Sequence, residues 1–285
     1  MSTDSARPPP ATGSAALATP APAGPKARIL AITSGKGGVG KTFIAANLAA
    51  ALVRQGQRVL VLDADLGLAN LDVVLNLAPK VTLHDVFTGK TALEDAVLPA
   101  PGGFSVLLAG SGLVEYSRLT GEVREQLLKI VETLTPRYDH ILLDTGAGIS
   151  DVVLFAVSLA QEVLVVATPE PTSMTDAYAT IKVLATQQQR RAIHLVVNQA
   201  SRAGEGRALR AQLQKVVDQY VTPLVVPLTD DPVQPVQPVR LDLLGEIPID
   251  PAVREAVQKR RLLLELLPGC PAAQAVGAIA TRLLA

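Results

Sequence analysis

A glycine-rich segment near the start of the chain limits the fold more than any other part of the sequence. Residues 34–42 read Ser-Gly-Lys-Gly-Gly-Val-Gly-Lys-Thr and match G-x-x-x-x-G-K-[ST], the phosphate-binding loop of nucleotide hydrolases. The apolar run Arg28–Thr33 before it predicts a buried strand, and Ile44, Leu48 and Leu52 after it predict one face of a helix. A strand, a phosphate loop and a helix in this order indicate an α/β nucleotide-binding domain.

The residue types in this loop suit a bound triphosphate. Glycine leaves room for backbone N–H groups to point at phosphate oxygens, and the helix that follows adds its positive N-terminal end. Lys41 is expected to contact the β- and γ-phosphates, and the Thr42 hydroxyl is expected to bind Mg²⁺, so the expected cofactors are ATP and Mg²⁺. The predicted nucleotide-binding residues of the loop are Gly35, Lys36, Gly37, Gly38, Val39, Gly40, Lys41, Thr42 and Phe43.

The composition indicates an ample hydrophobic core and no overall charge. Of 285 residues, 48% are hydrophobic, and 26 Lys and Arg balance 26 Asp and Glu, so no global basic field attracts nucleic acid. The single cysteine, Cys270, excludes an intrachain disulfide and an iron–sulfur site that needs two cysteines per subunit. The sequence has neither a signal-peptide pattern nor an apolar run that could span a bilayer, which predicts a cytosolic protein.

Apolar strands and amphipathic helices alternate along the rest of the chain. This pattern predicts α/β architecture: a single-domain P-loop NTPase with a mostly parallel central sheet and helices on both faces. Residues 1–27 are rich in Ala and Pro and predict a disordered tail, so the ATPase domain is expected over residues 28–285. Residues 230–240 predict a proline-rich loop, and residues 251–265 and 271–285 predict terminal helices.

Acidic residues follow two of the predicted strands. Asp63 and Asp65 come at the end of one apolar run, and Asp144 ends another. Because the carboxyl ends of parallel strands meet at one edge of a sheet, these side chains are expected beside the phosphates. Asp144 is predicted on the Mg²⁺ side of the site, Asp63 on Mg²⁺ or on a loop lysine, and Asp65 is predicted to orient the attacking water.

Two further residues have a functional and a structural interpretation. Asn198, at the end of another predicted strand, can offer a donor and an acceptor to an adenine edge, although Asn is also common in turns. Asp176 lies near the start of a predicted helix that Thr172 or Ser173 can cap. It is interpreted either as a charge that stabilises the helix N-terminus or as a dimer or partner contact.

The second lysine of the loop, Lys36, indicates a narrower family. The segment Gly-Lys-Gly-Gly-Val-Gly-Lys-Thr resembles the deviant P-loop family that includes MinD, ParA and the nitrogenase iron protein. The resemblance implies that Lys36 reaches across a face-to-face homodimer to the partner's ATP, and that Lys36, Lys41 and Asp65 are catalytic. Asp65 matches the hydrolytic aspartate of the family's Asp-x-Asp-x-Gly-x-x-Asn-Leu-Asp segment. The residues implied to lie near the base, in the exit loop of the last strand, are Ile247, Pro248 and Asp250.

Three longer segments, residues 144–150, 169–182 and 244–257, resemble FlhG proteins, also called FleN. The resemblance covers residues 28 to about 285. It implies an ATP-bound homodimer that hydrolysis returns to monomers. It also implies that the protein sets flagellar number and placement by binding a flagellar transcription activator of the FleQ or FlrA type, with the GTPase FlhF as a further partner and no direct binding of nucleic acid.

Two features depart from that family. The family's N-terminal Asp-Gln-Ala-x-x-Leu-Arg segment, which is implied to stimulate FlhF, is absent from Met1–Lys26. The helix predicted over residues 271–285 carries only Arg282 as a charged side chain, so either a docked core helix or a membrane-binding helix explains its apolar face. Attachment at the inner membrane or the cell pole is left open, and the alternative functions are a MinD-type division-site ATPase and a ParA-type DNA segregation ATPase.

Overall fold

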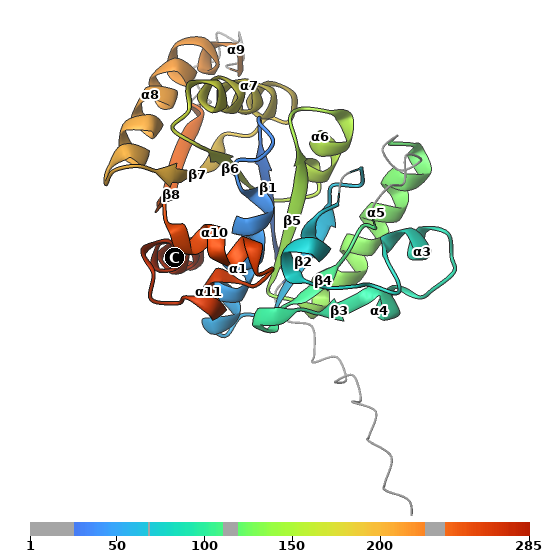
Figure 1. Ribbon diagram of the computed structural model, residues 1–285. Helices are drawn as coiled ribbons and strands as arrows, with labels where there is room; N and C mark the ends of the chain where they lie inside the picture. The colour runs from blue at the N-terminus through green and yellow to red at the C-terminus, as the bar shows by residue number, and fades with distance from the viewer. Residues whose placement is uncertain (1–25, 68, 111–118, 226–236) are drawn as a thin grey trace, which may run out of the picture.

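The computed structural model describes residues 26–67, 69–110, 119–225 and 237–285, and these residues form a layered α/β domain. The strands in this part of the chain are β1 (Arg28–Ser34), β2 (Val59–Ala64), β3 (Val97–Pro99), β4 (Ser105–Leu107), β5 (His140–Ala147), β6 (Glu162–Ala167), β7 (Ala192–Ala200) and β8 (Arg240–Pro248). They form one sheet in the order β3-β4-β2-β5-β1-β6-β7-β8, and every neighbouring pair is parallel except β3 with β4 (Figure 1).

Helices connect these strands and cover both faces of the sheet. The described α-helices are α1 (Lys41–Arg54), α2 (Leu71–Leu75), α3 (Leu83–Phe87), α4 (Leu93–Ala96), α5 (Gly121–Leu134), α6 (Asp151–Ser158), α7 (Pro171–Gln187), α8 (Glu205–Tyr220), α9 (Thr222–Val225), α10 (Pro251–Gln258), α11 (Leu263–Leu266) and α12 (Pro271–Leu284). Two short 3₁₀ turns cover Pro101–Gly103 and Thr135–Arg137.

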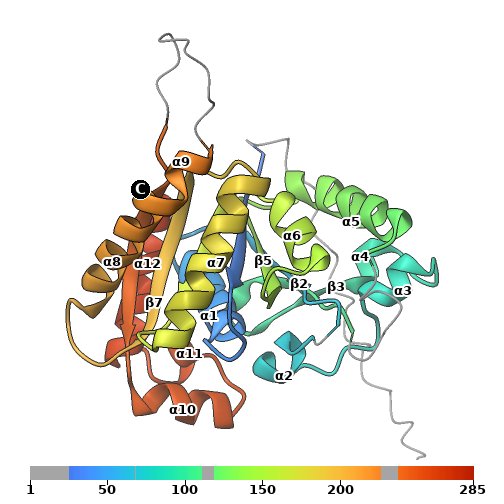
Figure 2. The ribbon, with the colours of Figure 1, turned by 90° about the horizontal axis from the view of Figure 1, so that it is seen from above.

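The central strands are apolar throughout because each of them contributes to two cores. In β1, Ile29 and Ala31 point into the core under α5, α6, α7 and α8, whereas Leu30 and Ile32 point into the core under α1, α11 and α12. Figure 2 shows the two helical layers on opposite sides of the sheet. This arrangement is typical of a parallel sheet that is buried on both faces, and it confirms the predicted α/β fold class.

The common direction of the strands brings distant parts of the chain together. The segments that follow β1, β2, β5, β6, β7 and β8 all leave from one edge of the sheet, which we call the carboxyl edge. Active sites of open α/β sheets lie at this edge. All the acidic and amide residues predicted at strand ends therefore meet there.

Several elements differ from the sequence-based expectation. The antiparallel edge strand β3 and the helices α2 and α6 were not predicted. The helix predicted over residues 251–265 is instead divided into α10 and α11, and Arg260 in the turn between them has φ 49°. A non-glycine residue in this left-handed region ends an α-helix. Residues 1–25 of the predicted tail and residues 230–236 of the predicted proline-rich loop lie outside the described residues.

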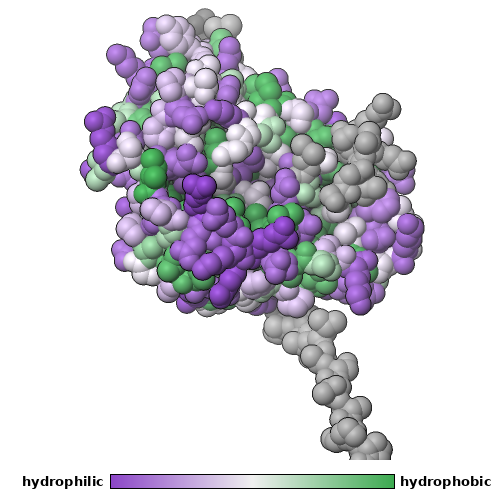
Figure 3. All heavy atoms as spheres, in the orientation of Figure 1, coloured by the Kyte–Doolittle hydropathy of each residue, from purple (hydrophilic) through white to green (hydrophobic). Residues whose placement is uncertain are grey.

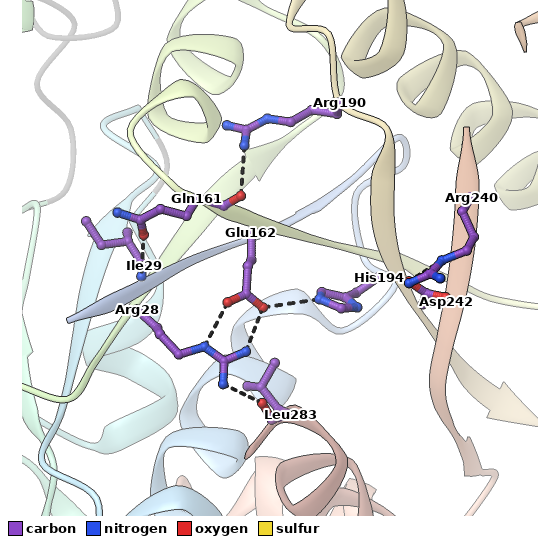
Figure 4. Close-up of polar contacts among 9 residues, drawn as sticks. All are labelled: Arg28, Ile29, Gln161, Glu162, Arg190, His194, Arg240, Asp242 and Leu283. Atoms are coloured by element: carbon purple, nitrogen blue, oxygen red, sulfur yellow. Dashed lines mark hydrogen bonds and ion pairs between the residues drawn. The ribbon is translucent and has the colours of Figure 1, made fainter. Parts of the chain in front are cut away.

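The terminal helix α12 is docked on the domain. Val276, Ile279, Ala280 and Leu283 on its apolar face are all buried against β8 and α1. At the opposite edge of the sheet from the nucleotide loop, Arg28 donates to the Leu283 carbonyl at 2.8 Å (Figure 4). This burial favours the docked-helix interpretation, and no described helix is long and apolar enough to cross a bilayer.

An ion cluster at the start of the strands fixes this end of α12. Arg28 binds Glu162 with two hydrogen bonds of 2.8 and 3.0 Å, and His194 Nε2 lies 3.2 Å from the same carboxylate (Figure 4). The contact with His194, together with the ion pair to Arg28, lowers the pKa of Glu162 to about 2. Glu162 is therefore charged at neutral pH and holds Arg28 in position for its bond to α12.

Replacing Ile279 with alanine should destabilise the whole domain if α12 belongs to the core. Ile279 packs on Gly245 of β8, where an added Cβ would lie 2.6 Å from Ile279 Cγ1. Loss of a buried isoleucine side chain costs about 2–5 kcal/mol of unfolding free energy. Urea denaturation of Ile279→Ala measures this loss, with the exposed Thr281→Ala on the same helix as the control. A loss below about 0.5 kcal/mol, typical of a surface site, would contradict the docking.

Candidate nucleotide-binding site

The phosphate loop connects the carboxyl end of β1 to the first turn of α1. Gly38 and Gly40 have φ 78° and 100°, in the left-handed region that favours glycine. Gly35 lies against the backbone carbonyl of Asp176 in α7, and a Cβ on Gly40 would lie 2.5 Å from Asn198 Nδ2. These positions therefore require glycine, because the backbone takes a left-handed conformation there or because α7 and Asn198 approach the loop closely.

Lys41 is the buried cation of the loop. Its side chain is 9% exposed, and Nζ donates a hydrogen bond to Ser34 Oγ at 2.9 Å. Burial lowers the pKa of Lys41, while the carboxylates of Asp144 and Asp65 act in the opposite direction. Lys41 borders a cavity of about 590 Å³, a size typical of small-molecule sites. The cavity is lined by Gly37, Gly38, Gly40, Lys41, Thr42, Phe43, Asp63, Ala64, Asp65, Gly67, Asn70, Asp144, Thr145, Gly146, Ala147, Ser150, Val152 and Val153.

Two carboxylates lie side by side at the base of this cavity. Asp63 and Asp144 are register partners on the neighbouring strands β2 and β5, and both are buried. Burial raises both pKa values, that of Asp144 to about 7, and the charge of Asp144 adds to the rise at Asp63. The Thr42 hydroxyl donates a hydrogen bond to Asp144. The three residues predicted to hold Mg²⁺ therefore lie together.

The oxygen atoms around this point leave hydrogen-bonding capacity unused. Two of them, Asp63 Oδ2 and Asp144 Oδ1, are buried without a hydrogen-bond partner among the described residues. Buried polar atoms are normally paired, so these oxygens indicate a ligand that supplies the missing contacts. Mg²⁺ prefers oxygen ligands, and the donor set fits it. The metal-binding roles of Thr42, Asp63 and Asp144 stay predictions.

Asp65 occupies a different position from Asp63. It follows β2, is half-buried and lines the cavity. A Cβ on Gly146, in the last part of β5, would lie 3.4 Å from Asp65 Oδ1. Asp65 therefore stands where the segments after β2 and β5 approach each other, at the solvent-accessible side of the buried carboxylates. A water molecule can reach this carboxylate, as the predicted hydrolytic role requires.

Lys36 is bound within its own chain. Its Nζ donates to Glu170 Oε2 at 2.7 Å and to Thr172 Oγ1 at 3.1 Å, and both partners lie at the start of α7. The ion pair is solvent-exposed, with side-chain exposures of 39% and 59%. An exposed pair of this kind contributes only about 0–1 kcal/mol, so Lys36 can leave it at small cost. Its role across a dimer stays a prediction.

The start of α7 differs from the expected cap. Glu170 is the N-cap residue and Pro171 follows it, so the prediction that Thr172 or Ser173 caps this helix is wrong. Ser173 Oγ instead accepts a hydrogen bond from the Thr168 N–H at 3.0 Å. Asp176 is half-buried in the second turn and packs against Gly35. The predicted contact of Asp176 with a second copy or another partner stays a prediction.

Asn198 anchors the phosphate loop to β7. Its Nδ2 donates to the Val39 carbonyl at 2.8 Å, and its Oδ1 accepts the Gln199 N–H at 3.0 Å. The side chain is 7% exposed and its amide orientation is fixed by these two bonds. Asn198 thus lies at the carboxyl edge beside the loop, as predicted, and its contact with an adenine base stays a prediction.

Two of the residues predicted near the base, at the end of β8 and after it, stabilise the fold. The Ile247 side chain is fully buried in the core under α1. Asp250 caps α10 by accepting the Ala252 N–H at 2.9 Å, and it also accepts the Ala272 N–H at 3.1 Å. The predicted base contact of this segment would therefore involve Pro248 or backbone groups rather than the Ile247 side chain.

Some site residues were missed by the sequence analysis. Asn70 and Ser150 line the cavity, and Glu170 binds Lys36. Asn70 lies within the motif that begins at Asp63, and Ser150 ends the segment that begins at Asp144. Both residues could therefore have been predicted from these sequence motifs.

Comparisons with known proteins agree with this geometry. A family model described as ParA, the NUBPL iron-transfer P-loop NTPase, matches residues 26–284. The chain is 42% identical over 255 residues to the antiactivator FleN of Pseudomonas aeruginosa, covering 90% of this chain and 85% of that protein. It is 31% identical to the flagellum site-determining protein YlxH of Helicobacter pylori, covering 90% of this chain and 82% of that protein. The described residues contain no group of three or more His, Cys, Asp or Glu placed to hold a metal ion.

A solved structure of this type contains a nucleotide. The septum site-determining protein MinD of Pyrococcus horikoshii, complexed with Mg-ADP, superposes with a TM-score of 0.70 at 28% identity, over 90% of this chain and 96% of that chain. The site described above and these similarities together indicate binding of a nucleotide with Mg²⁺.

Proposed function

The chain belongs to the ParA family of P-loop NTPases, and we propose that it is a MinD-like ATPase switch that regulates the number or placement of flagella. The single observation that supports this most is the 42% identity to antiactivator FleN over 90% of the chain. The family and the complete phosphate loop establish an ATPase. The ATP-dependent dimer, the flagellar output and the partner are the proposed parts.

In the proposed mechanism, the loop and the start of α1 bind the phosphates of ATP. Backbone N–H groups and Lys41 neutralise the phosphate charge, and Asn198 holds the loop in its binding shape. Thr42, Asp63 and Asp144 would hold Mg²⁺, and the ion would supply a positive charge that balances the phosphates. Asp65 orients the attacking water, because it is the accessible carboxylate at the cavity rim.

The change between states is proposed to involve Lys36 and the loop after β5. Lys36 leaves Glu170 and Thr172 and reaches the ATP of a second copy, where its charge stabilises the transition state. Loss of the γ-phosphate releases the segment that follows Gly146 and returns the protein to monomers. ATP therefore sets how long the dimer exists.

The proposed partner is a flagellar transcription activator, because the relative FleN is an antiactivator. FlhF is a further candidate, although residues 1–26 lack the segment associated with its stimulation. Direct binding of nucleic acid is not proposed, because positive and negative side chains balance. Peripheral membrane attachment, if it occurs, would need a surface other than the buried face of α12.

Deletion of the gene in its host tests the flagellar output. Electron microscopy should show extra or misplaced flagella with normal cell division. Minicells with normal flagella would instead assign the protein to the MinD-type division-site class. Normal flagella and normal division would reject both and leave DNA segregation of the ParA type, which ATP-dependent and salt-sensitive retention on DNA would detect.

Lys36→Ala should reduce ATP turnover at least about tenfold while leaving ATP affinity of the monomer nearly unchanged, because the lysine is proposed to act only on the partner's ATP. Turnover per wild-type chain should rise with protein concentration, and this rise should be lost in the variant. Glu170→Ala is the control, since it removes the ion pair but keeps the lysine. Wild-type turnover that is independent of concentration would refute the cross-dimer role.

A further inference from the structure

The last residue of β1, Ser34, is a polar residue enclosed by the protein. Polar side chains usually lie at the surface, as they do over α10 (Figure 3). Ser34 is instead 0% exposed, pairs with Ala147 of β5, and accepts the Gly148 N–H on its carbonyl at 2.8 Å. Its backbone is therefore held by the sheet, and the position of the hydroxyl depends on rotation about the Cα–Cβ bond alone.

The Ser34 hydroxyl makes two hydrogen bonds of opposite direction to the phosphate loop. Its Oγ donates to the Lys36 carbonyl at 2.7 Å and accepts from Lys41 Nζ at 2.9 Å. A hydroxyl has one donor hydrogen and two acceptor lone pairs, so the two bonds together fix both the rotamer and the direction of the hydrogen. Ser34 thereby joins the start of the loop to its end.

The bond to the Lys36 carbonyl sets the direction of the next N–H group. The described residues contain no cis peptide bond, and in a planar trans peptide the N–H and the C=O point in opposite directions. The Gly37 N–H therefore points away from Ser34. Gly37 lines the cavity, whereas Ser34 does not. The hydroxyl thus keeps this N–H turned toward the cavity, where backbone N–H groups can bind phosphate oxygens.

A second buried side chain acts on the loop in the same way. Asn198 Nδ2 donates to the Val39 carbonyl at 2.8 Å. The N–H of the same peptide belongs to Gly40, which also lines the cavity. Two carbonyls of the loop are therefore bound by side chains that come from different strands, β1 and β7. Such contacts give the loop its shape before a ligand enters, which lowers the cost of binding.

The bond to Lys41 controls a charge that has competing partners. The carboxylates of Asp144 and Asp65 both act on Lys41, and both residues line the same cavity. An ammonium group has three donor hydrogens, so one can stay on Ser34 while the others face the cavity. Without the hydroxyl, attraction would turn the ammonium toward the carboxylates, away from the place where the phosphates are expected.

We propose that Ser34 is a positioning residue for the phosphates of the nucleotide. Its hydroxyl holds the Gly37 N–H and the Lys41 ammonium in the binding arrangement before the nucleotide enters, and it does not touch the nucleotide itself. The inference rests on the proposed contact of the loop and Lys41 with the phosphates. It is independent of the proposed dimer and of the flagellar output.

Ser34→Ala should weaken the binding of Mg-ADP about tenfold, because both hydrogen bonds are lost and one of them is made to a charged group. ADP is the probe because its binding is separate from hydrolysis and from the proposed dimer, and isothermal titration calorimetry measures the dissociation constant. Ser34→Thr keeps a hydroxyl with the same donor and acceptor capacity and should bind within about threefold of the wild type.

Turnover should respond differently from affinity. At a fixed protein concentration, Ser34→Ala should raise the KM for ATP about tenfold and lower kcat less than about threefold, because the lost interaction supports the ground state and the transition state alike. The hydroxyl contacts neither Asp65 nor the Lys36 ammonium, the groups proposed to act in the reaction. Phosphate release measured over a range of ATP concentrations gives both constants.

Thr33→Val is the matched control. Thr33 precedes Ser34, is also 0% exposed, and its Oγ1 has no hydrogen-bond partner among the described residues. Removal of this unpaired hydroxyl should leave the affinity for Mg-ADP within about twofold of the wild type. If Ser34→Ala does not fold, Ser34→Cys replaces it, because a thiol is only a weak donor and acceptor.

The outcomes separate a positioning role from a structural one. A hydroxyl that served only the fold would lower the midpoint of thermal unfolding in Ser34→Ala and leave the dissociation constant of the folded protein unchanged. Wild-type or tighter affinity in Ser34→Ala, an equal loss in Thr33→Val, or no recovery in folded Ser34→Thr would overturn this inference and leave the proposed function intact. A fall in kcat with unchanged affinity would do the same. Failure of the wild type to bind Mg-ADP would overturn the proposed phosphate site itself.

Discussion

Replacing Lys41 with alanine is expected to weaken ATP binding by a factor of roughly 30 to several thousand, the effect of removing one partner from a buried charge pair worth about 2–5 kcal/mol. The lysine is 9% exposed and borders the cavity, so its charge acts on the phosphates with little screening by water. Isothermal titration calorimetry with ATP and Mg²⁺ measures the change. Retention of tight ATP binding would reject the assignment of the loop.

The same substitution should leave the fold intact, which makes the result interpretable. The charge of Lys41 acts on the buried Asp144, but burial still raises the pKa of Asp144 to about 7. Without the lysine this carboxyl group can take up a proton at neutral pH instead of remaining as an unpaired charge. Thermal unfolding monitored by circular dichroism checks that Lys41→Ala melts near the wild-type temperature in the absence of nucleotide.

The parts of the site that could be predicted from sequence are those encoded by neighbouring residues. The phosphate loop lies between a strand and a helix in an unbroken stretch, and Asp63 and Asp144 each end an apolar run. Parallel pairing then brings these two carboxylates into register. The local sequence pattern and the parallel direction of the strands were sufficient to predict this part of the site, because no contact between distant side chains had to be known.

The parts that could not be predicted depend on contacts between distant residues. The Lys36–Glu170 ion pair joins residues 134 positions apart, and nothing in either local sequence encodes it. The elements α2 and β3 have only 5 and 3 residues, too few for a periodic pattern. The amphipathic pattern of α12 fits a membrane surface as well as a protein core, so only its packing on β8 and α1 could distinguish them.

Asp65→Ala should keep ATP binding but reduce turnover by about 10²- to 10⁴-fold, the usual contribution of a residue that positions or deprotonates a reacting group. The phosphate loop and Lys41 are untouched, so affinity for ATP should change little. Because hydrolysis is proposed to return the dimer to monomers, the variant should accumulate as a dimer with ATP itself. Phosphate release and size-exclusion chromatography measure the two effects on one preparation, and Asp65→Asn tests whether the charge is needed.

The alternative carboxylate for this role is Asp63, and its surroundings argue against it. Asp63 is 1% exposed, and burial together with the charge of Asp144 raises its pKa well above the usual range. A carboxyl group that is 1% exposed is poorly placed to orient a water that enters from the cavity. Asp65 is half-buried at the rim, beside Gly146 in the segment expected to follow the γ-phosphate. Normal turnover in Asp65→Ala would therefore remove the accessible carboxylate of this pair from the mechanism, and the attacking water would have to be positioned by the backbone that follows Gly146.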